Sequence, residues 1–350
     1  MANIRRLFAG TNSAGGFVSF FAHITNQGTK NVYLLKGGPG TGKSRFMQDL
    51  AETPELKDTA QERFYCSSDP FSLDAVHLPQ LGTALIDATA PHAIDAEWPG
   101  CRDHLIPLGN FWSKAGLIER RDEIVAAGRD KKSHFAAAFR YFAAAKLIEE
   151  NIIARNPVDP GAVSAAVKKL APLLNRSDWN GEKGRVRRLF ASALTPEGYV
   201  SFVEGLAAEC DERYILTGGI GHTAAACLGE LASLAELTGL DAEIFHYPLN
   251  PDRIQHIIFP QLKVGIFSET ILEKLEKIGG TAIACAPADS AEDGVAGDQT
   301  LFRELVERGI ASLKRAETSH GAVEKYYAEQ MDFSLVAQER NRVLGEILHL

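Results

Sequence analysis

A glycine-rich stretch near the N-terminus carries the most specific chemical signature of this chain. It reads Gly37-Gly38-Pro39-Gly40-Thr41-Gly42-Lys43-Ser44 and satisfies the pattern G-x-x-x-x-G-K-[ST] in full. In such a loop backbone N–H groups converge on phosphate oxygens, the following helix adds unpaired N–H groups, the lysine neutralises charge and the hydroxyl binds Mg²⁺. The stretch predicts a site for ATP and Mg²⁺, and the alternative is a glycine-rich turn with a solvated lysine. The residues expected to contact the nucleotide are Gly38, Pro39, Gly40, Thr41, Gly42, Lys43, Ser44 and Arg45.

The segments around this loop have the pattern of an α/β protein. Residues 31–36 form a short apolar run that ends at the glycines, which predicts a buried strand. Residues 43–52 place Phe46, Met47, Leu50 and Ala51 on one face, which predicts a helix. Residues 63–66 and 83–86 are further predicted strands. This order of strand, loop, helix and strand is typical of a parallel sheet flanked by helices.

Two aspartates that follow predicted strands are candidates for catalysis and metal binding. Asp87 ends an apolar strand, where a phosphate-loop enzyme keeps the carboxylate that holds Mg²⁺. Together with Ser44 it makes the expected metal site, and a turn or helix-cap role is the alternative. Asp69 follows the strand at 63–66, at the edge where open α/β sheets bind ligands, and would orient water or a substrate hydroxyl or cap the turn before Pro70. Lys43, Asp87 and Asp69 are the expected catalytic residues.

The chain contains an internal repeat whose period is about half its length. Residues 5–20 and 187–202 are identical at nine of sixteen positions, and each begins with Arg-Arg-Leu-Phe-Ala. The strand before the glycine loop then matches residues 214–216. A tandem duplication of one domain explains this pattern. We expect tandem duplicated P-loop NTPase domains at residues 1–180 and 181–350, with the boundary near Asn180 to Gly184.

In this alignment the second glycine loop keeps its glycines and loses its chemistry. Residues 218–221 (Gly-Gly-Ile-Gly) face residues 37–40, so Lys43 faces Ala224 and Ser44 faces Ala225. No charge would then remain for phosphates and no hydroxyl for a metal. The alignment predicts a degenerate second site, or an unusual and shifted one.

The repeat also serves as an internal comparison between the copies. Asp87 faces Ser268 and Asp69 faces Asn250, whereas apolar positions such as Phe64 and Phe245 are kept. Residues that serve only a phosphate site are free to change once that site is lost. The comparison therefore supports a role for both aspartates in the first site.

The segment between the two copies has the pattern of helices. An alanine-rich run with phenylalanines at helical spacing lies within residues 111–175, which either complete the first domain or form a lid over its site. Residues 299–316 and 321–331 predict two further helices. Arg185, Arg187 and Arg188 cluster near the boundary and form either a solvated linker or the source of an arginine finger for the first site.

The composition is that of an acidic globular protein. Of 350 residues, 45% are hydrophobic and 23% are charged, with a formal net charge of −8. The acidic balance argues against nucleic-acid binding, and no apolar run is long enough to span a membrane. Five cysteines without a C-x-x-C pair are expected to be reduced thiols. With no secretory signal at the N-terminus, the expected location is the cytoplasm.

The chain resembles a bacterial family of tandem P-loop proteins described as conserved hypothetical ATPases or nucleotide-kinase-like proteins. The resemblance covers nearly the whole chain, including the glycine loop, Cys66-Ser67-Ser68-Asp69, Asp87-Ala88-Thr89-Ala90-Pro91-His92 and Thr195-Pro196-Glu197-Gly198. It implies a tandem P-loop fold and nucleotide binding without a settled substrate. The second copy in that family often keeps an intact loop, and this sequence departs from the family there.

Three functions are compatible with these observations. The first is Mg-dependent ATP hydrolysis at the N-terminal site, with the second copy as a regulatory or structural partner. The second is a kinase that passes the γ-phosphate of ATP to a nucleotide or small-molecule acceptor. The third is a non-catalytic, ATP-dependent switch or scaffold. A protein partner or a homo-oligomer stays open for each of them.

Overall fold

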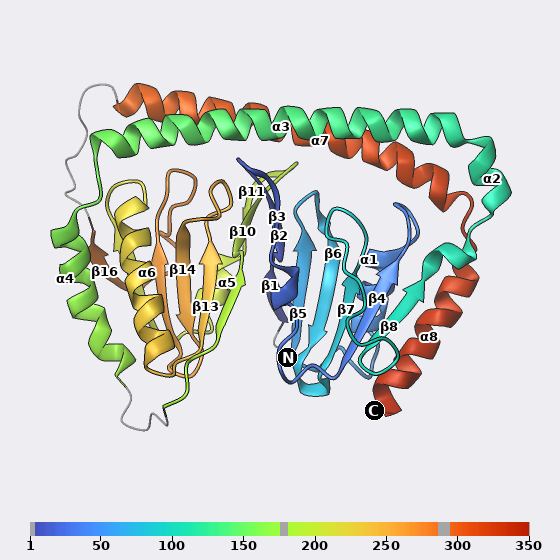
Figure 1. Cartoon of the computed structure of the whole chain (residues 1–350), viewed down its shortest axis with the longest axis horizontal. Coiled ribbons are helices and arrows are strands. Elements are labelled where there is room, and N and C mark those ends of the chain that lie inside the picture. Colours follow the sequence, from blue (N-terminus) through green and yellow to red (C-terminus); the bar gives the residue numbers. More distant parts are fainter. Residues whose placement is uncertain (1–3, 176–180, 286–294, 350) are drawn as a thin grey trace.

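Two mixed six-stranded sheets, each flanked by helices, form the two halves of the protein (Figure 1). The computed structural model describes residues 4–175, 181–285 and 295–349. The expected domain boundary begins at Asn180, which lies outside the described residues. In spatial order the first sheet contains β1 (Ile4–Leu7), β5 (Gln61–Cys66), β6 (Asp69–Leu78), β7 (Thr83–Asp87), β4 (Asn31–Lys36) and β8 (Asp103–Pro107).

The sequence predicts a parallel sheet, but the first sheet is mixed. Its strand β6 runs antiparallel to both neighbours. Its other neighbouring pairs are parallel. Residues 67–68 form a tight connection after β5, and a connection this short can only return the chain in the opposite direction. The prediction missed β6 because Asp69 and Pro70 have the composition of a turn.

The second sheet repeats the topology of the first. Its order is β16 (Thr281–Ala284), β12 (Glu212–Thr217), β15 (Val264–Ser268), β14 (Ile254–Phe259), β13 (Ala242–His246) and β9 (Val186–Leu189). β14 is antiparallel to both neighbours, as β6 is. Each half also has one two-stranded hairpin, formed by β2 (Gly10–Ser13) and β3 (Gly16–Ser19) and by β10 (Ser192–Thr195) and β11 (Gly198–Ser201). The sequence repeat is therefore a repeat of structure.

Two long helices bridge both halves. α3 (Arg121–Arg155) and α7 (Val295–Ala328) lie side by side above the two sheets (Figure 1). They approach so closely that a methyl group on Gly309 would lie 2.3 Å from the ring of Phe142. α7 runs without a break through residues 317–321, where the sequence predicts the end of one helix and the start of another. One glycine inside a helix costs only about 1 kcal/mol, and packing on α3 offsets it.

The helices that follow this pair are exchanged between the halves. α4 (Pro160–Leu170), which follows α3, packs on α6 (His222–Leu237) of the second half. α8 (Phe333–His349), which follows α7, packs on α1 (Lys43–Ala51) of the first half. The short helices α2 (Lys114–Glu119) and α5 (Val203–Ala207) complete the set. Residues 111–174 are helical as expected, and they cover the second sheet as well as bridging the two.

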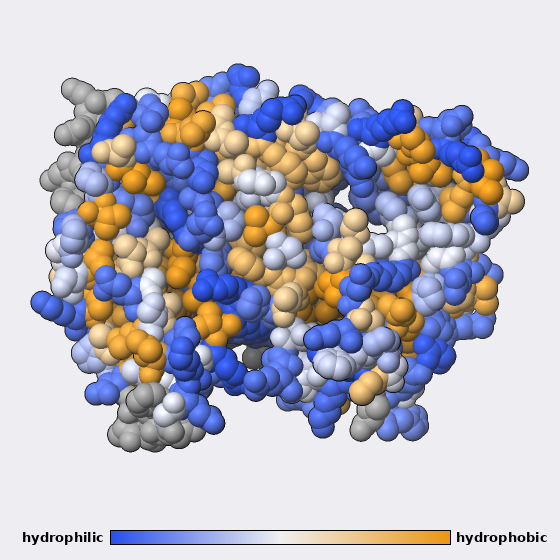
Figure 2. All heavy atoms as spheres, viewed as in Figure 1, coloured by the Kyte–Doolittle hydropathy of each residue, from blue (hydrophilic) through white to orange (hydrophobic). Residues whose placement is uncertain are grey.

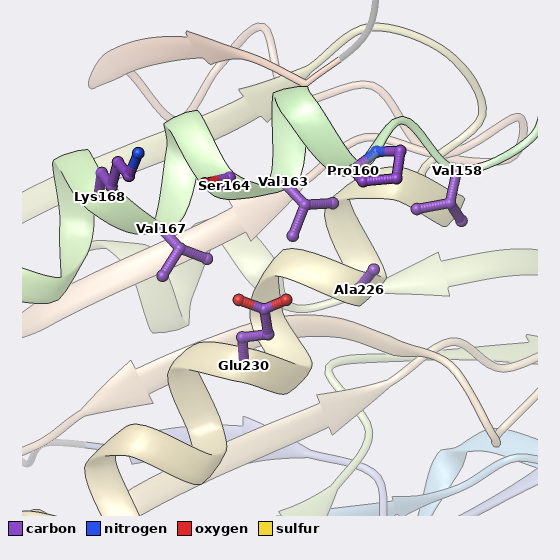
Figure 3. Close-up of a pocket in the computed structure, with 8 residues that line it drawn as sticks. All are labelled: Val158, Pro160, Val163, Ser164, Val167, Lys168, Ala226 and Glu230. Carbon is purple, nitrogen blue, oxygen red and sulfur yellow. The ribbon is translucent and has the colours of Figure 1, made fainter.

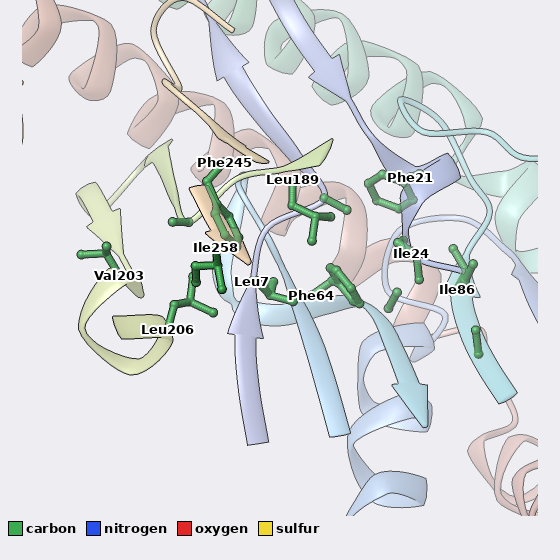
Figure 4. Close-up of a cluster of buried hydrophobic side chains, with 14 of the residues drawn as sticks. Leu7, Phe21, Ile24, Phe64, Ile86, Leu189, Val203, Leu206, Phe245 and Ile258 are labelled. Carbon is green, nitrogen blue, oxygen red and sulfur yellow. The ribbon is translucent and has the colours of Figure 1, made fainter. Parts of the chain in front are cut away.

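A shared apolar core joins the halves. Leu7 and Phe64 of the first half pack with Leu189 and Phe245 of the second, and all four side chains are fully buried (Figure 4). Beside this core Phe8 and Phe190 exchange two backbone hydrogen bonds of 3.0 Å. Because equivalent residues meet each other, the halves are related by an approximate two-fold axis.

Four charged side chains lie together near this axis. Arg5 contacts Glu62 at 2.8 Å and Glu243 at 2.6 Å, and Arg187 contacts the same two glutamates at 2.7 and 3.1 Å. Arg187 is therefore neither a solvated linker residue nor an arginine finger. We call these residues the central ion cluster. It explains why the arginines are kept in both copies, since each bridges its own half to the other.

The surface mixes charged and apolar residues over the face shown in Figure 2. Among the described helices, none is long and apolar enough to cross a membrane. All five cysteines are free thiols. An opening is visible between the helix pair and the first half of the molecule (Figure 2).

Candidate functional site

The glycine loop, residues 37–44, connects β4 to α1 as the sequence predicts. Gly40 (φ 69°) and Gly42 (φ 84°) have left-handed backbone conformations, which favour glycine over residues with a side chain. Gly42 is the N-cap of α1, so the unpaired N–H groups of the first helical turn belong to the loop. Phe46, Met47, Leu50 and Ala51 are buried and hold the helix on the sheet. A rigid helix N-terminus preceded by left-handed glycines can bind an anion.

Lys43 folds over this loop. Its Nζ donates to the carbonyl oxygens of Gly38 at 2.8 Å and Gly37 at 3.2 Å. The same Nζ lies 3.6 Å from Oδ2 of Asp87, at the end of the parallel neighbour strand β7. Both side chains are mostly buried, with exposed fractions of 10% and 16%. Lys43 and Asp87 therefore meet at the carboxyl ends of β4 and β7, as the sequence predicts.

Asp87 lies in a polar environment of its own. Its Oδ1 accepts the Thr89 N–H at 3.0 Å, and its backbone carbonyl is 2.9 Å from Nδ1 of His92. Burial raises the pKa of Asp87 more than the charges of Lys43 and His92 lower it. His92 is buried 3.6 Å from Asp74, and although burial lowers its pKa, Asp74 and Asp87 raise it more. A cation bound beside Asp87 would favour its ionised form.

The side chains of three other residues predicted for the site, Ser44, Asp69 and Arg45, differ in how they lie relative to the loop. Ser44 accepts the Leu73 N–H on its Oγ at 2.9 Å, so its hydroxyl stays beside the loop with its proton free to donate. Asp69 accepts the Phe71 N–H at 3.1 Å and a hydrogen bond from Ser72, which is a turn-capping role. No hydrogen bond or ion pair of the described residues joins Asp69 to Lys43. Arg45 pairs with Asp49 on its own helix and is 77% exposed, so it points away from the loop.

The C-terminal end of α7 covers the glycine loop, a feature that the sequence does not reveal. A methyl group on Gly40 would lie 2.2 Å from the carbonyl oxygen of Glu324, and one on Gly38 would lie 2.9 Å from the ring of Tyr327. The Gly40 N–H and Lys43 lower the pKa of the Glu324 carboxyl, but burial and Asp69 raise it more. No local pattern links residues so far apart in the chain, so only the fold could reveal this contact.

The structure corrects the alignment of the second loop. Residues 218–221 connect β12 to α6, whereas the longer segment 37–42 connects β4 to α1. Gly219 (φ 63°) and Gly221 (φ 85°) repeat the backbone conformations of Gly40 and Gly42, and Gly221 is the N-cap of α6. The pairing of Lys43 with Ala224 and of Ser44 with Ala225 is therefore wrong. The residues at the start of α6 are His222 and Thr223, since the deletion lies inside the loop, where repeated glycines concealed it.

The second loop nevertheless lacks the charge of the first. Burial is the main cause that lowers the pKa of His222, which favours a neutral ring at the lysine position. Arg253 donates from Nη2 to the carbonyl oxygen of Ile220 at 3.0 Å. Its Nη1 lies 2.9 Å from the fully buried carboxylate of Glu149. An internal ion pair thus lies against this loop. The position of Asp87 is occupied in the second half by Ser268, whose hydroxyl donates to the backbone carbonyl of Gln255.

Two cavities of the described residues are lined by no residue of either glycine loop. One, of about 350 Å³, is lined by residues of both α4 and α6, with Lys168 and Glu230 on opposite sides (Figure 3). Another of about 410 Å³ lies beside the start of α8, where Trp112 packs on Tyr327 with ring centroids 5.5 Å apart. Within residues 4–175, 181–285 and 295–349, no group of three or more His, Cys, Asp or Glu side chains could hold a metal ion. A metal held by Asp87 and Ser44 would complete its coordination with water or with oxygens of a bound phosphate.

No protein family, no curated protein and no solved structure matches this chain. The resemblance to tandem P-loop ATPases thus stays a prediction that rests on the residues quoted for it.

Proposed function

We propose that the first half binds Mg·ATP in the glycine loop and hydrolyses it, and that the second half is a degenerate copy. The observation that carries the proposal is the convergence of Lys43 and Asp87, 3.6 Å apart, on a loop with left-handed glycines at a helix N-terminus. A cation that can bind phosphates and a carboxylate that can bind a metal then lie together at the glycine loop. An isolated glycine turn has no need for this pair.

The residues present fit the ligand chemically. Lys43 would exchange its bonds to the Gly37 and Gly38 carbonyls for phosphate oxygens, which are stronger acceptors. Ser44 and Asp87 offer the hard oxygen ligands that Mg²⁺ prefers. Bound there, Mg²⁺ would neutralise charge that develops between the β- and γ-phosphates. Asp87 would hold the metal, directly or through water, in its ionised form, which a bound cation favours.

Phosphoryl transfer to an acceptor remains the alternative reaction of the same site. The cover formed by the end of α7 favours it, because a kinase must shield the γ-phosphate from water. A nucleotide-dependent switch is the third candidate, in which this cover moves without chemistry. Both alternatives share the ATP site and differ from hydrolysis only in the step after binding.

Calorimetric titration of the whole chain with Mg·ATP tests the proposal. We expect Lys43→Ala to weaken ATP binding by roughly 30-fold or more, since a charge-assisted contact contributes about 2 kcal/mol or more. Lys57→Ala, which removes an exposed lysine after α1, is the matched control and should leave the affinity unchanged. Equal affinity in all three proteins would refute an ATP site at this loop. Phosphate release from the wild type, absent in Lys43→Ala, would distinguish hydrolysis from a switch.

A further inference from the structure

The helix pair brings charged side chains of both long helices to the covered side of the glycine loop. Lys131 of α3 donates from Nζ to Nδ1 of His320 on α7 at 3.1 Å. Nε2 of His320 lies 3.6 Å from Oε1 of Glu324. The backbone of Glu324 in turn packs against Gly40. A continuous chain of contacts therefore runs from Lys131 to the loop.

Lys131 lacks the partner that a half-buried lysine normally has. Within the part of the chain that the structure describes, no carboxylate lies within ion-pair distance of it, and its neighbour His320 is an imidazole. Burial lowers the pKa of Lys131, and Lys132 and Lys43 lower it further, while Glu324 and Cys66 oppose this. Burial, Lys131 and Lys43 lower the pKa of His320 to about 4, against the charge of Asp69. Two lysines thus influence the same partly buried space, and a half-buried cation without a carboxylate is costly unless an anion joins it.

The geometry limits where that anion can lie. His320 and Glu324 are four residues apart on α7, which is about 6 Å along the helix axis. Since the backbone of Glu324 touches Gly40, His320 and the Lys131 ammonium bound to it lie about one turn of α7 away from that contact.

We propose that Lys131 binds the terminal phosphate of a nucleoside triphosphate held in the glycine loop, with His320 positioning its ammonium group. The inference rests on the proposed ATP site and adds a way for that site to distinguish ATP from ADP. Lys43 serves phosphates inside the loop, whereas Lys131 reaches only a phosphate that projects out of it. The site would therefore prefer ATP over ADP through a residue of α3.

The approximate two-fold axis supplies an internal comparison. α4 and α8 begin 173 residues apart, and by this offset Lys131 and His320 correspond to Glu304 and Leu147. Glu304 pairs with Arg308 of its own helix, and Leu147 is 61% exposed. The lysine and the histidine are thus found only at the end of the helix pair that covers the loop with Lys43.

Binding of ADP and of the non-hydrolysable β,γ-imido analogue of ATP, each with Mg²⁺, tests the inference by calorimetry. We expect Lys131→Ala to weaken binding of the analogue about tenfold or more and binding of ADP less than about twofold, because one charge-assisted bond is lost. Lys131→Arg should restore most of the preference. Lys132→Ala, which removes the exposed lysine next to it, should change neither affinity.

The outcomes separate this inference from the ATP site itself. If the wild type binds both nucleotides and Lys131→Ala weakens both equally or neither, the role of Lys131 is overturned and the ATP site stands. If the wild type binds neither nucleotide, both fail together. A purely structural role for Lys131 would lower the unfolding midpoint without changing the ratio of the two affinities.

Discussion

The contact between Gly40 and α7 gives a prediction that the structure makes quantitative. In Gly40→Ala the new methyl group would lie 2.2 Å from the carbonyl oxygen of Glu324, 2.8 Å from its carbonyl carbon and 2.9 Å from its Cα. All three are backbone atoms, so no side-chain rotation can relieve the overlap. To restore van der Waals contact the end of α7 must move by roughly 1 Å, and overpacking of this kind costs about 1–3 kcal/mol.

The substitution also places alanine at a left-handed φ, which has a cost of its own. Gly100→Ala is the matched control, because Gly100 has φ 73° against 69° for Gly40, and a methyl group added there would meet no atom within 4 Å. Each variant should lose about 1–2 kcal/mol from backbone strain, partly offset through the unfolded chain. The difference between the variants then measures the contact with α7 alone.

Urea unfolding of both variants, with hydrogen exchange at residues 320–328, is the appropriate assay. We expect Gly40→Ala to be less stable than Gly100→Ala by about 1–3 kcal/mol and to exchange faster at the end of α7. Equal unfolding free energies together with unchanged exchange there would show that α7 does not press on the loop and that the site is not covered.

Two further predictions concern carboxylates. Glu324→Gln removes a negative charge beside the loop and should tighten Mg·ATP binding at neutral pH by about fivefold, a gain of roughly 1 kcal/mol. Because the pKa of Glu324 is raised, the wild-type affinity for Mg·ATP should rise as the pH falls from about 7 to 5. The variant should lack this rise in a fluorescent-nucleotide titration. A rise in the variant as large as that of the wild type, or larger, would contradict this role of Glu324. Glu62→Gln in the central ion cluster should cost about 3–5 kcal/mol in urea unfolding at neutral pH, because Arg5 and Arg187 lose a shared partner. Despite burial, hydrogen bonds to His77 and Arg187 lower the pKa of Glu62. The stability that Glu62 contributes is therefore present above the ordinary glutamate pKa of about 4.3 and is lost as the pH falls through the lower pKa of the folded state. The variant should lose less stability than the wild type on acidification to about pH 3, and an equal loss would contradict this.

The sequence predicted those parts of the site that depend on neighbouring residues. The strand at 31–36, the helix that starts at Lys43 and the strand that ends at Asp87 each have a local pattern, and all three are confirmed. Parallel neighbours then bring their carboxyl ends together, so the approach of Lys43 to Asp87 follows from sheet geometry. The sequence repeat corresponds to a repeat of structure, because the two sheets share one topology.

The features that the sequence could not predict depend on contacts between distant segments. Glu324 covers Gly40 although nearly the whole chain separates them, and nothing in the pattern of either segment indicates the contact. The second loop was misaligned because a deletion among glycines leaves the letters unchanged, whereas the backbone angles of Gly219 and Gly221 locate it. Arg187 looked like a surface residue until its partners, Glu62 and Glu243, were known.

The exchange of α4 and α8 has a consequence for the origin of the chain. Each half lacks the helix that shields its own sheet, so neither would hide its apolar surface if it were made alone. Two identical single-copy chains could supply that helix to each other, and such a pair would be a symmetric, arm-exchanged homodimer. In a homodimer every substitution is present in both subunits. In a single chain that holds both halves each loop can carry its own residues, as Lys43 in one and His222 in the other.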